Sequence, residues 1–71
     1  MAERDVERDC KKEEFVAALR RVADALEAGE SFRIQVVNSR FTVPANAALS
    51  IEHEASDEVE ELELQLRWKP S

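Results

Sequence analysis

The sequence contains few side chains that could do chemistry, and the first two are a lone histidine and a lone cysteine, His53 and Cys10. A thiol at a helix start has a lowered pKa, but a nucleophile also needs a base and a group that orients that base. No histidine lies within helical reach of Cys10. Zinc needs several converging ligands, and Glu52 and Glu54 point to the opposite face of an extended strand from His53. We therefore predict a protein that is not an enzyme, with no catalytic residue, no cofactor and no metal site.

Carboxylates form the most unusual surface that the sequence predicts. Glu52 and Glu54 alternate with apolar residues, as Glu61 and Glu63 do further along the chain. If Glu54 lies opposite Glu61, the like charges repel each other at a cost of about 0.2–1 kcal/mol. One interpretation is a solvated face that prevents edge-to-edge aggregation. The alternatives are a basic partner or a bound cation. Acid/base catalysis needs a pocket that separates the environments of two carboxylates, and a flat exposed face provides none.

Trp68 is the only tryptophan in the sequence. It follows Leu62, Leu64 and Leu66 on the same side of an extended segment, which is typical of an aromatic residue at the edge of a core. The alternative is a partner hot spot, because tryptophan is enriched at such anchors. A further alternative is a small-ligand-binding or enzyme accessory protein that uses the core rim near Trp68 and His53.

One amphipathic helix is predicted over residues 11–28. Its apolar stripe follows the spacing i, i+4, i+7, i+8 and i+11, which is one face of a helix. The stripe consists of Phe15, Leu19, Val22, Ala23 and Leu26. Asp9 or Cys10 is the expected N-cap, the latter with Glu13 in a poor capping box. Gly29 is the only glycine, and we expect it to end the helix in the left-handed conformation.

After the helix, the apolar period falls to two, which is typical of strands. A hairpin with an Asn38-Ser39 loop would pair Ile34 with Val43 and Val36 with Phe41. A second hairpin covers residues 49–68, with a turn at 56–58, and a proline follows each hairpin. All strands have one apolar face, so we expect the helix to cover it. The predicted fold class is α+β, with one N-terminal helix packed on a four-stranded antiparallel sheet made of two consecutive β-hairpins. We expect six residues to fill the interior and leave no room for a pocket: Phe15, Leu19, Leu26, Phe32, Phe41 and Leu64.

The chain has 71 residues, a length that predicts a single domain, here at residues 10–71. Residues 1–9 are mostly charged, so we expect them to form a charged N-terminal arm. A chain this short buries only roughly 60% of its unfolded surface, so subunit pairing would help it and we expect a homodimer. The net charge of −6 argues against nucleic-acid and membrane partners. A single cysteine cannot form an internal disulfide, and the charged N-terminus lacks the apolar segment of a signal peptide. The expected location is the cytoplasm.

Three segments, in this order, resemble the amphi-Trp domain family: FVAALRRVADALEAG at residues 15–29, FRIQVVNSRFTVP at 32–44, and ELELQLRW at 61–68. The resemblance covers about residues 10–68. The family takes its name from an amphipathic last strand that ends in tryptophan. The chain departs from the family pattern at two places. Cys10 stands where a polar helix cap is expected, and Asn38-Ser39 stands in the hairpin turn, where glycine is expected. The family is one of uncharacterised small proteins, so the resemblance implies a fold and no activity.

We predict a small non-catalytic interaction module that self-associates through the outer face of its sheet. The first hairpin places basic and polar residues on that face, and the second hairpin places acidic ones there. Two copies could therefore set arginine against glutamate, in ion pairs that select orientation more than they add affinity. The predicted contact residues are Arg33, Gln35, Arg40, Thr42, Glu52, Glu54, Glu61, Glu63, Arg67 and Trp68.

Overall fold

The helix ends where the single glycine predicts. A computed structural model describes residues 7–70 and contains α1 at Lys12–Ala28. Gly29 has φ 68° and ψ 32°, the left-handed conformation. Its N–H donates to the Leu26 carbonyl at 3.1 Å, and the next N–H along the chain donates to the Ala25 carbonyl at 2.9 Å. This pair of bonds is the Schellman motif, which satisfies carbonyls that the helix itself leaves free.

The start of α1 differs from the prediction. Lys11, and neither Asp9 nor Cys10, is the N-cap. Its backbone N–H donates to Glu14 Oε1 at 3.3 Å, and Glu14 Oε2 lies 3.3 Å from the guanidinium of Arg8. Glu14 belongs to the first turn, where a negative charge interacts favourably with the positive end of the helix dipole. One carboxylate therefore replaces the side-chain cap that we expected from Asp9 or Cys10.

Four strands follow the helix, as the alternation predicts, but they form two separate sheets. They are β1 at Phe32–Val36, β2 at Ser39–Val43, β3 at Ala48–Ala55 and β4 at Glu60–Arg67. Strand β1 pairs with β2, and β3 pairs with β4, both antiparallel. Within the described part of the chain, no ladder joins β2 to β3. The α+β class and the element order are confirmed, and the prediction of one four-stranded sheet is wrong.

The first hairpin is two residues away from the predicted register. Ile34 lies opposite Phe41 instead of Val43, and the loop consists of Val37 and Asn38. A slip of one residue would have moved every side chain to the other face of the sheet. A slip of two residues preserves the faces, so the apolar and polar sides of this hairpin are as predicted.

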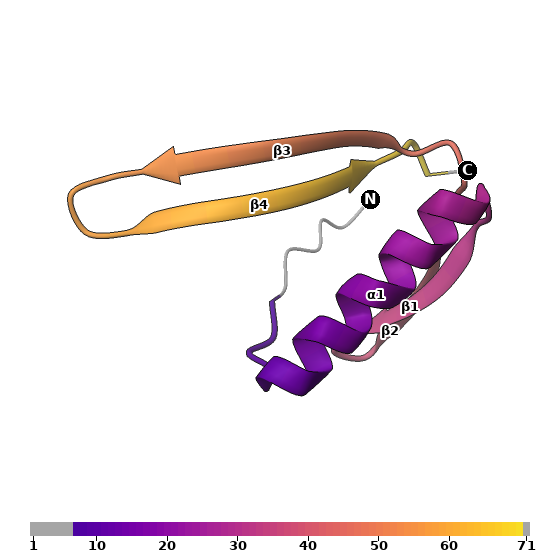
Figure 1. Ribbon diagram of the computed structural model, residues 1–71, viewed down its shortest axis with the longest axis horizontal. Coiled ribbons are helices and arrows are strands. Elements are labelled where there is room, and N and C mark those ends of the chain that lie inside the picture. The colour runs from indigo at the N-terminus through magenta and orange to yellow at the C-terminus, as the bar shows by residue number, and fades with distance from the viewer. Residues whose placement is uncertain (1–6, 71) are drawn as a thin grey trace.

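The connection between the hairpins explains why they separate. Pro44 has no N–H to donate to a ladder, so it ends β2. A turn follows, in which the Ala47 N–H donates to the Pro44 carbonyl at 3.3 Å. Strand β3 leaves this turn away from β2, and the β3–β4 hairpin extends far from the helix and the first hairpin (Figure 1). We name this hairpin, residues 48–67, the arm.

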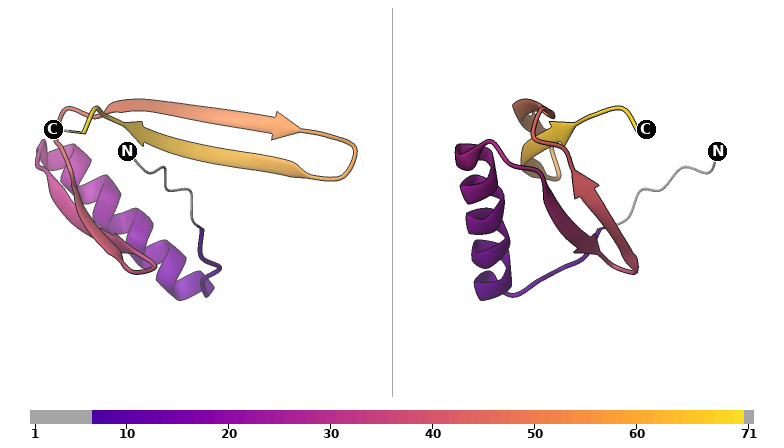
Figure 2. Two further views of the ribbon diagram at one scale, coloured as in Figure 1. Left: turned by 180° about the vertical axis from the view of Figure 1, so that it is seen from behind. Right: turned by 90° about the vertical axis from the view of Figure 1, so that its right-hand side faces the viewer.

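The small core lies between the end of α1 and the base of the first hairpin, and the hairpin diverges from the helix towards its turn (Figure 2). Among residues 7–70 only Val43 is buried, with 4% of its surface exposed, while Val22 and Leu26 of the helix are half-buried. The Arg21 guanidinium donates to the Arg33 carbonyl at 2.7 Å and so connects α1 to β1. The core is therefore restricted to the second half of the helix.

Three of the six predicted interior residues are exposed. Phe15 and Leu19 on α1 and Leu64 on the arm expose 56%, 43% and 57% of their surfaces. Leu26, Phe32 and Phe41 are half-buried, as their faces predict. Alternation shows which side of a strand is apolar, but it does not show which element covers that side. The prediction of a filled interior is wrong because the arm leaves Phe15 and Leu19 of α1 exposed.

Candidate interaction surfaces

The outer side of the first hairpin is basic and polar. Arg33, Gln35, Arg40 and Thr42 are all exposed on the side of β1 and β2 that faces away from α1. Gln35 lies opposite Arg40, whose guanidinium donates to Gln35 Oε1 at 3.4 Å, while the Gln35 amide donates to the Val37 carbonyl at 3.1 Å. The sequence predicted this grouping, and we name these four residues the basic face.

One side of the arm is strongly acidic. Glu52 lies opposite Glu63, and Glu54 lies opposite Glu61, so the like charges face each other as the register predicts. The Gln65 amide donates to Glu52 at 3.4 Å and to Glu63 at 3.3 Å. A hydrogen bond with Glu52 and the charge of Glu54 raise the pKa of Glu63. We name the four glutamates the acidic face.

Three of these carboxylates lie close enough to share a cation. Oxygen atoms of Glu52, Glu54 and Glu63 lie within 4.8 Å of one another. Calcium takes about six to eight oxygen ligands, and magnesium requires a nearly ideal octahedron. Three carboxylates on a strand surface supply only part of such a shell, and the Gln65 amide already donates to two of them. The absence of a metal site stays a prediction.

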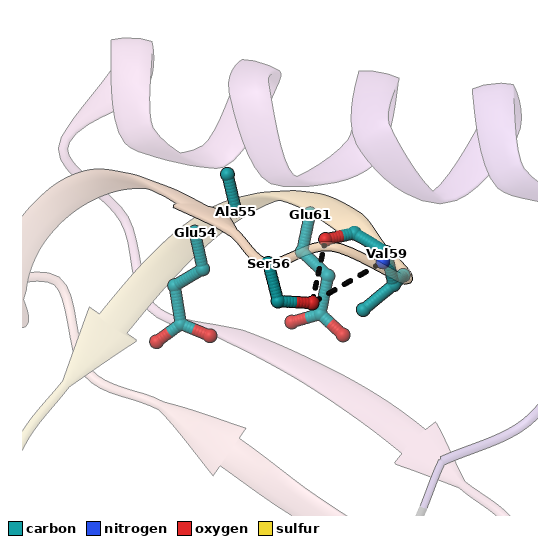
Figure 3. Close-up of a pocket in the computed structure, with 5 residues that line it drawn as sticks. All are labelled: Glu54, Ala55, Ser56, Val59 and Glu61. Carbon is teal, nitrogen blue, oxygen red and sulfur yellow. Dashed lines mark hydrogen bonds between the residues drawn. The ribbon is translucent and has the colours of Figure 1, made fainter.

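A shallow hollow of about 420 Å³ lies at the tip of the arm (Figure 3). Its walls are Glu54, Ala55, Ser56, Val59 and Glu61. The Ser56 N–H donates to the Val59 carbonyl at 2.9 Å, and the Val59 N–H donates to the Ser56 hydroxyl at 3.2 Å. These bonds confirm the predicted turn. The carboxylates of Glu54 and Glu61 lie on the same side of the hairpin (Figure 3).

The other side of the arm is an exposed apolar face. It consists of Leu49, Ile51, Leu62 and Leu64, which expose 57–74% of their surfaces. Alternation predicts that these residues share one side of the strands and that the helix covers it; they do share one side, but the helix does not cover it. Their exposure has no local sequence signal, because it depends on the direction in which the arm leaves Pro44. Contiguous exposed apolar surface marks interaction sites.

Trp68 and His53 lie at opposite ends of the arm. His53 pairs with Leu62, six residues before Trp68, which is roughly 20 Å along a strand. Trp68 stacks on Phe41, with ring centroids 6.2 Å apart, and 38% of its surface is exposed. His53 Nε2 instead lies 2.8 Å from Glu60 Oε2 in an exposed pair. One ligand site cannot include both Trp68 and His53.

The helix, the two hairpins and the tryptophan that follows amphipathic β4 are the features of one known domain. The family model of the Amphi-Trp domain matches residues 1–71. The chain belongs to the Amphi-Trp domain family. No curated protein and no solved structure matches it. Within residues 7–70 of this Amphi-Trp chain, no helix is long and apolar enough to cross a membrane. The Amphi-Trp match assigns no activity.

Proposed function

We propose that this Amphi-Trp chain is a small non-catalytic interaction module that self-associates through the surfaces of its two hairpins. The exposed apolar face of the arm is the observation that supports this most strongly. Burying one leucine or isoleucine side chain stabilises a protein by about 1.5–3 kcal/mol. The arm presents four such side chains to water. Their removal from water gives association a large driving force.

Charge supports a second copy of the same chain as the partner. The basic face and the acidic face lie on different hairpins, so two copies can oppose them reciprocally across a two-fold axis. The net charge of −6 works against any self-association, but salt screens this repulsion. The same charge underlies our expectation that nucleic acids and membranes are not partners, and the location that we propose is the cytoplasm.

Light scattering in low and high salt tests the proposal. We expect a mass of twice 8.1 kDa at both salt concentrations, because burial of apolar surface does not depend on ion pairs. Replacing both Arg33 and Arg40 with glutamine should leave a dimer, but the dissociation constant of that dimer should depend differently on salt. A chain that stays monomeric at every salt and protein concentration would end the proposal.

A ligand-binding role is the second candidate, and it now depends on Trp68 alone. A hollow of about 470 Å³ beside this residue is also lined by Thr42, Pro44, Asn46 and Lys69. Its volume falls within the range of about 300–1,000 Å³ that is usual for small-molecule sites. Fluorescence of Trp68 during a small-molecule screen checks this role, since a ligand in the hollow would change the emission. Unchanged emission throughout the screen would count against it.

A further inference from the structure

We propose that two copies of the chain exchange arms, so that the arm of each copy completes a four-stranded sheet under α1 of the other. The inference rests on the proposed self-association and specifies its geometry. Each chain contains two uncovered apolar surfaces, the apolar face of the arm and the first half of the helix stripe, where Phe15 and Leu19 are exposed. Each of these surfaces offers the cover that the other lacks.

The dimensions of the two surfaces agree. Strands of eight residues, as in the arm, are about 26 Å long, and the 17 residues of α1 also extend about 26 Å. The five-residue strands β1 and β2 reach only about 17 Å. The first hairpin begins beside the end of the helix, so it leaves the first turns around Phe15 uncovered. An arm placed beside it is long enough to reach those turns.

The hinge favours exchange between chains. Only four residues, 44–47, connect β2 to β3, and the bond from Ala47 to Pro44 closes them into a turn. The stacking of Trp68 on Phe41 fixes the base of the arm on its own chain. Short hinges favour the exchange of an element between identical chains over its folding back. The arm therefore points away from its own helix and is available to a second copy.

The completed sheet also reduces the repulsion between the glutamates of each arm. The apolar faces of all four strands would lie against the helix, so the basic face of one copy and the acidic face of the other would share the outer surface. The glutamates that repel each other in pairs within one arm would then have Arg33 and Arg40 of the second copy beside them. Such contacts fix which strands become neighbours more than they add affinity.

The surface area is sufficient for an obligate dimer. A compact monomer of 8.1 kDa exposes about 4,500 Å², whereas this chain exposes 6669 Å². The excess sets an upper limit of about 2,200 Å² on the area that each chain can bury beyond its present fold. Obligate dimers bury about 2,000–5,000 Å² in total, so two such chains supply enough.

Cross-linking between single-cysteine chains tests the exchange. In a Cys10→Ser background, one chain carries Leu19→Cys on the helix and the other carries Ile51→Cys on the arm, with tags of different mass. A short bis-maleimide is added to each chain alone and to their mixture. We expect a product that joins the helix of one chain to the arm of the other, in clear excess over the two homodimeric products.

The other outcomes separate this inference from the proposed function. Products that join arm to arm or helix to helix in excess would overturn the exchange and leave self-association standing. No product between chains, with a monomeric mass, would overturn both. A chain that carries both cysteines supplies the remaining outcome, because a link within one monomer would show that the arm folds back onto its own helix, which also overturns the exchange.

Two substitutions of adjacent β4 residues test the same face without cysteines. Leu62→Gln places an amide on the apolar face, and Glu61→Gln places the same amide on the acidic face. Each dimer contains two arms, so Leu62→Gln should raise the dissociation constant by about 100-fold, or tenfold for each arm. Glu61→Gln should leave it unchanged or lower it. Equal effects of the two substitutions would contradict the burial of the apolar face.

Discussion

Val37 has the least favourable backbone conformation for its residue type in the described chain. Its φ is 58°, a positive value that is rare for a β-branched side chain and costs about 1–2 kcal/mol. Asparagine accepts this conformation more readily. We expect Val37→Asn to stabilise the protein by about 1 kcal/mol in urea unfolding at a fixed protein concentration.

The neighbouring loop residue provides the control for this substitution. Asn38 is not among the residues with positive φ, so Asn38→Gly removes no strain and adds flexibility to the unfolded chain. It should leave the protein no more stable than the original. If Val37→Asn changes the stability of the protein in the same way as Asn38→Gly, the loop does not consist of these two residues.

Two glutamates should respond to pH with opposite signs. Hydrogen bonds from the Lys11 backbone and from Arg8 lower the pKa of Glu14, whereas Glu52 and Glu54 raise that of Glu63. The ordinary value for both is 4.5. Glu14 therefore stabilises the fold above that value, and this contribution is lost as the pH falls through its lowered folded pKa. Glu63 destabilises the fold above its raised pKa and ceases to do so as the pH falls below 4.5.

Substitution by glutamine separates these two effects. At pH 7, Glu63→Gln should raise the melting temperature, and Glu14→Gln should lower it. Both differences should shrink as the pH falls: the Glu63 difference should vanish below 4.5, and the Glu14 difference should vanish only below the lowered folded pKa of that carboxyl. Calorimetric scans at a series of pH values from 7 downward make the comparison. Shifts of the same sign at pH 7 would contradict the assigned contacts.

At the level of elements, the sequence predicts what depends on neighbours along the chain. The helix is correct to within one residue at its start because its stripe and Gly29 are local signals, and all four strands follow from alternation. The register of the first hairpin is not determined locally, because loops at residues 37–38 and 38–39 place the same side chains on the same face. Whether β2 pairs with β3 depends on the direction that the chain takes after Pro44, and alternation contains no information about that direction.

The attachment of the arm to the first hairpin is an element-scale feature that depends on Trp68. Stacking with Phe41 contributes about 0.5–1.5 kcal/mol beyond the burial of the ring. We expect Trp68→Ala to destabilise the protein by about 2 kcal/mol and Trp68→Phe by less than half of that, since a phenyl ring retains part of the stacking. Guanidinium unfolding followed by circular dichroism gives both values. Equal losses would mean that the stacking has no role.

At the scale of the whole molecule, the described chain lacks the core that a stable domain needs. Its radius of gyration of 13.6 Å exceeds the about 11 Å of a compact domain of this length. Eight of the ten predicted contact residues are grouped as their strand parity requires, on the basic face and the acidic face, while Arg67, which lies opposite Ala48, and Trp68 belong to neither. The apolar face of the arm was missed as a surface, because its exposure follows from tertiary arrangement and not from residue order. Folding and association should therefore be one event.

The dependence of unfolding on protein concentration tests this claim most directly. Urea unfolding of the full chain, followed by Trp68 fluorescence, is repeated over a hundredfold range of concentration. A folded dimer that dissociates into unfolded monomers gains about 1.4 kcal/mol of apparent stability for each tenfold increase. We predict an unfolding midpoint that rises steadily with concentration. A midpoint that stays constant over the whole range would show that one chain folds alone, and would contradict the account.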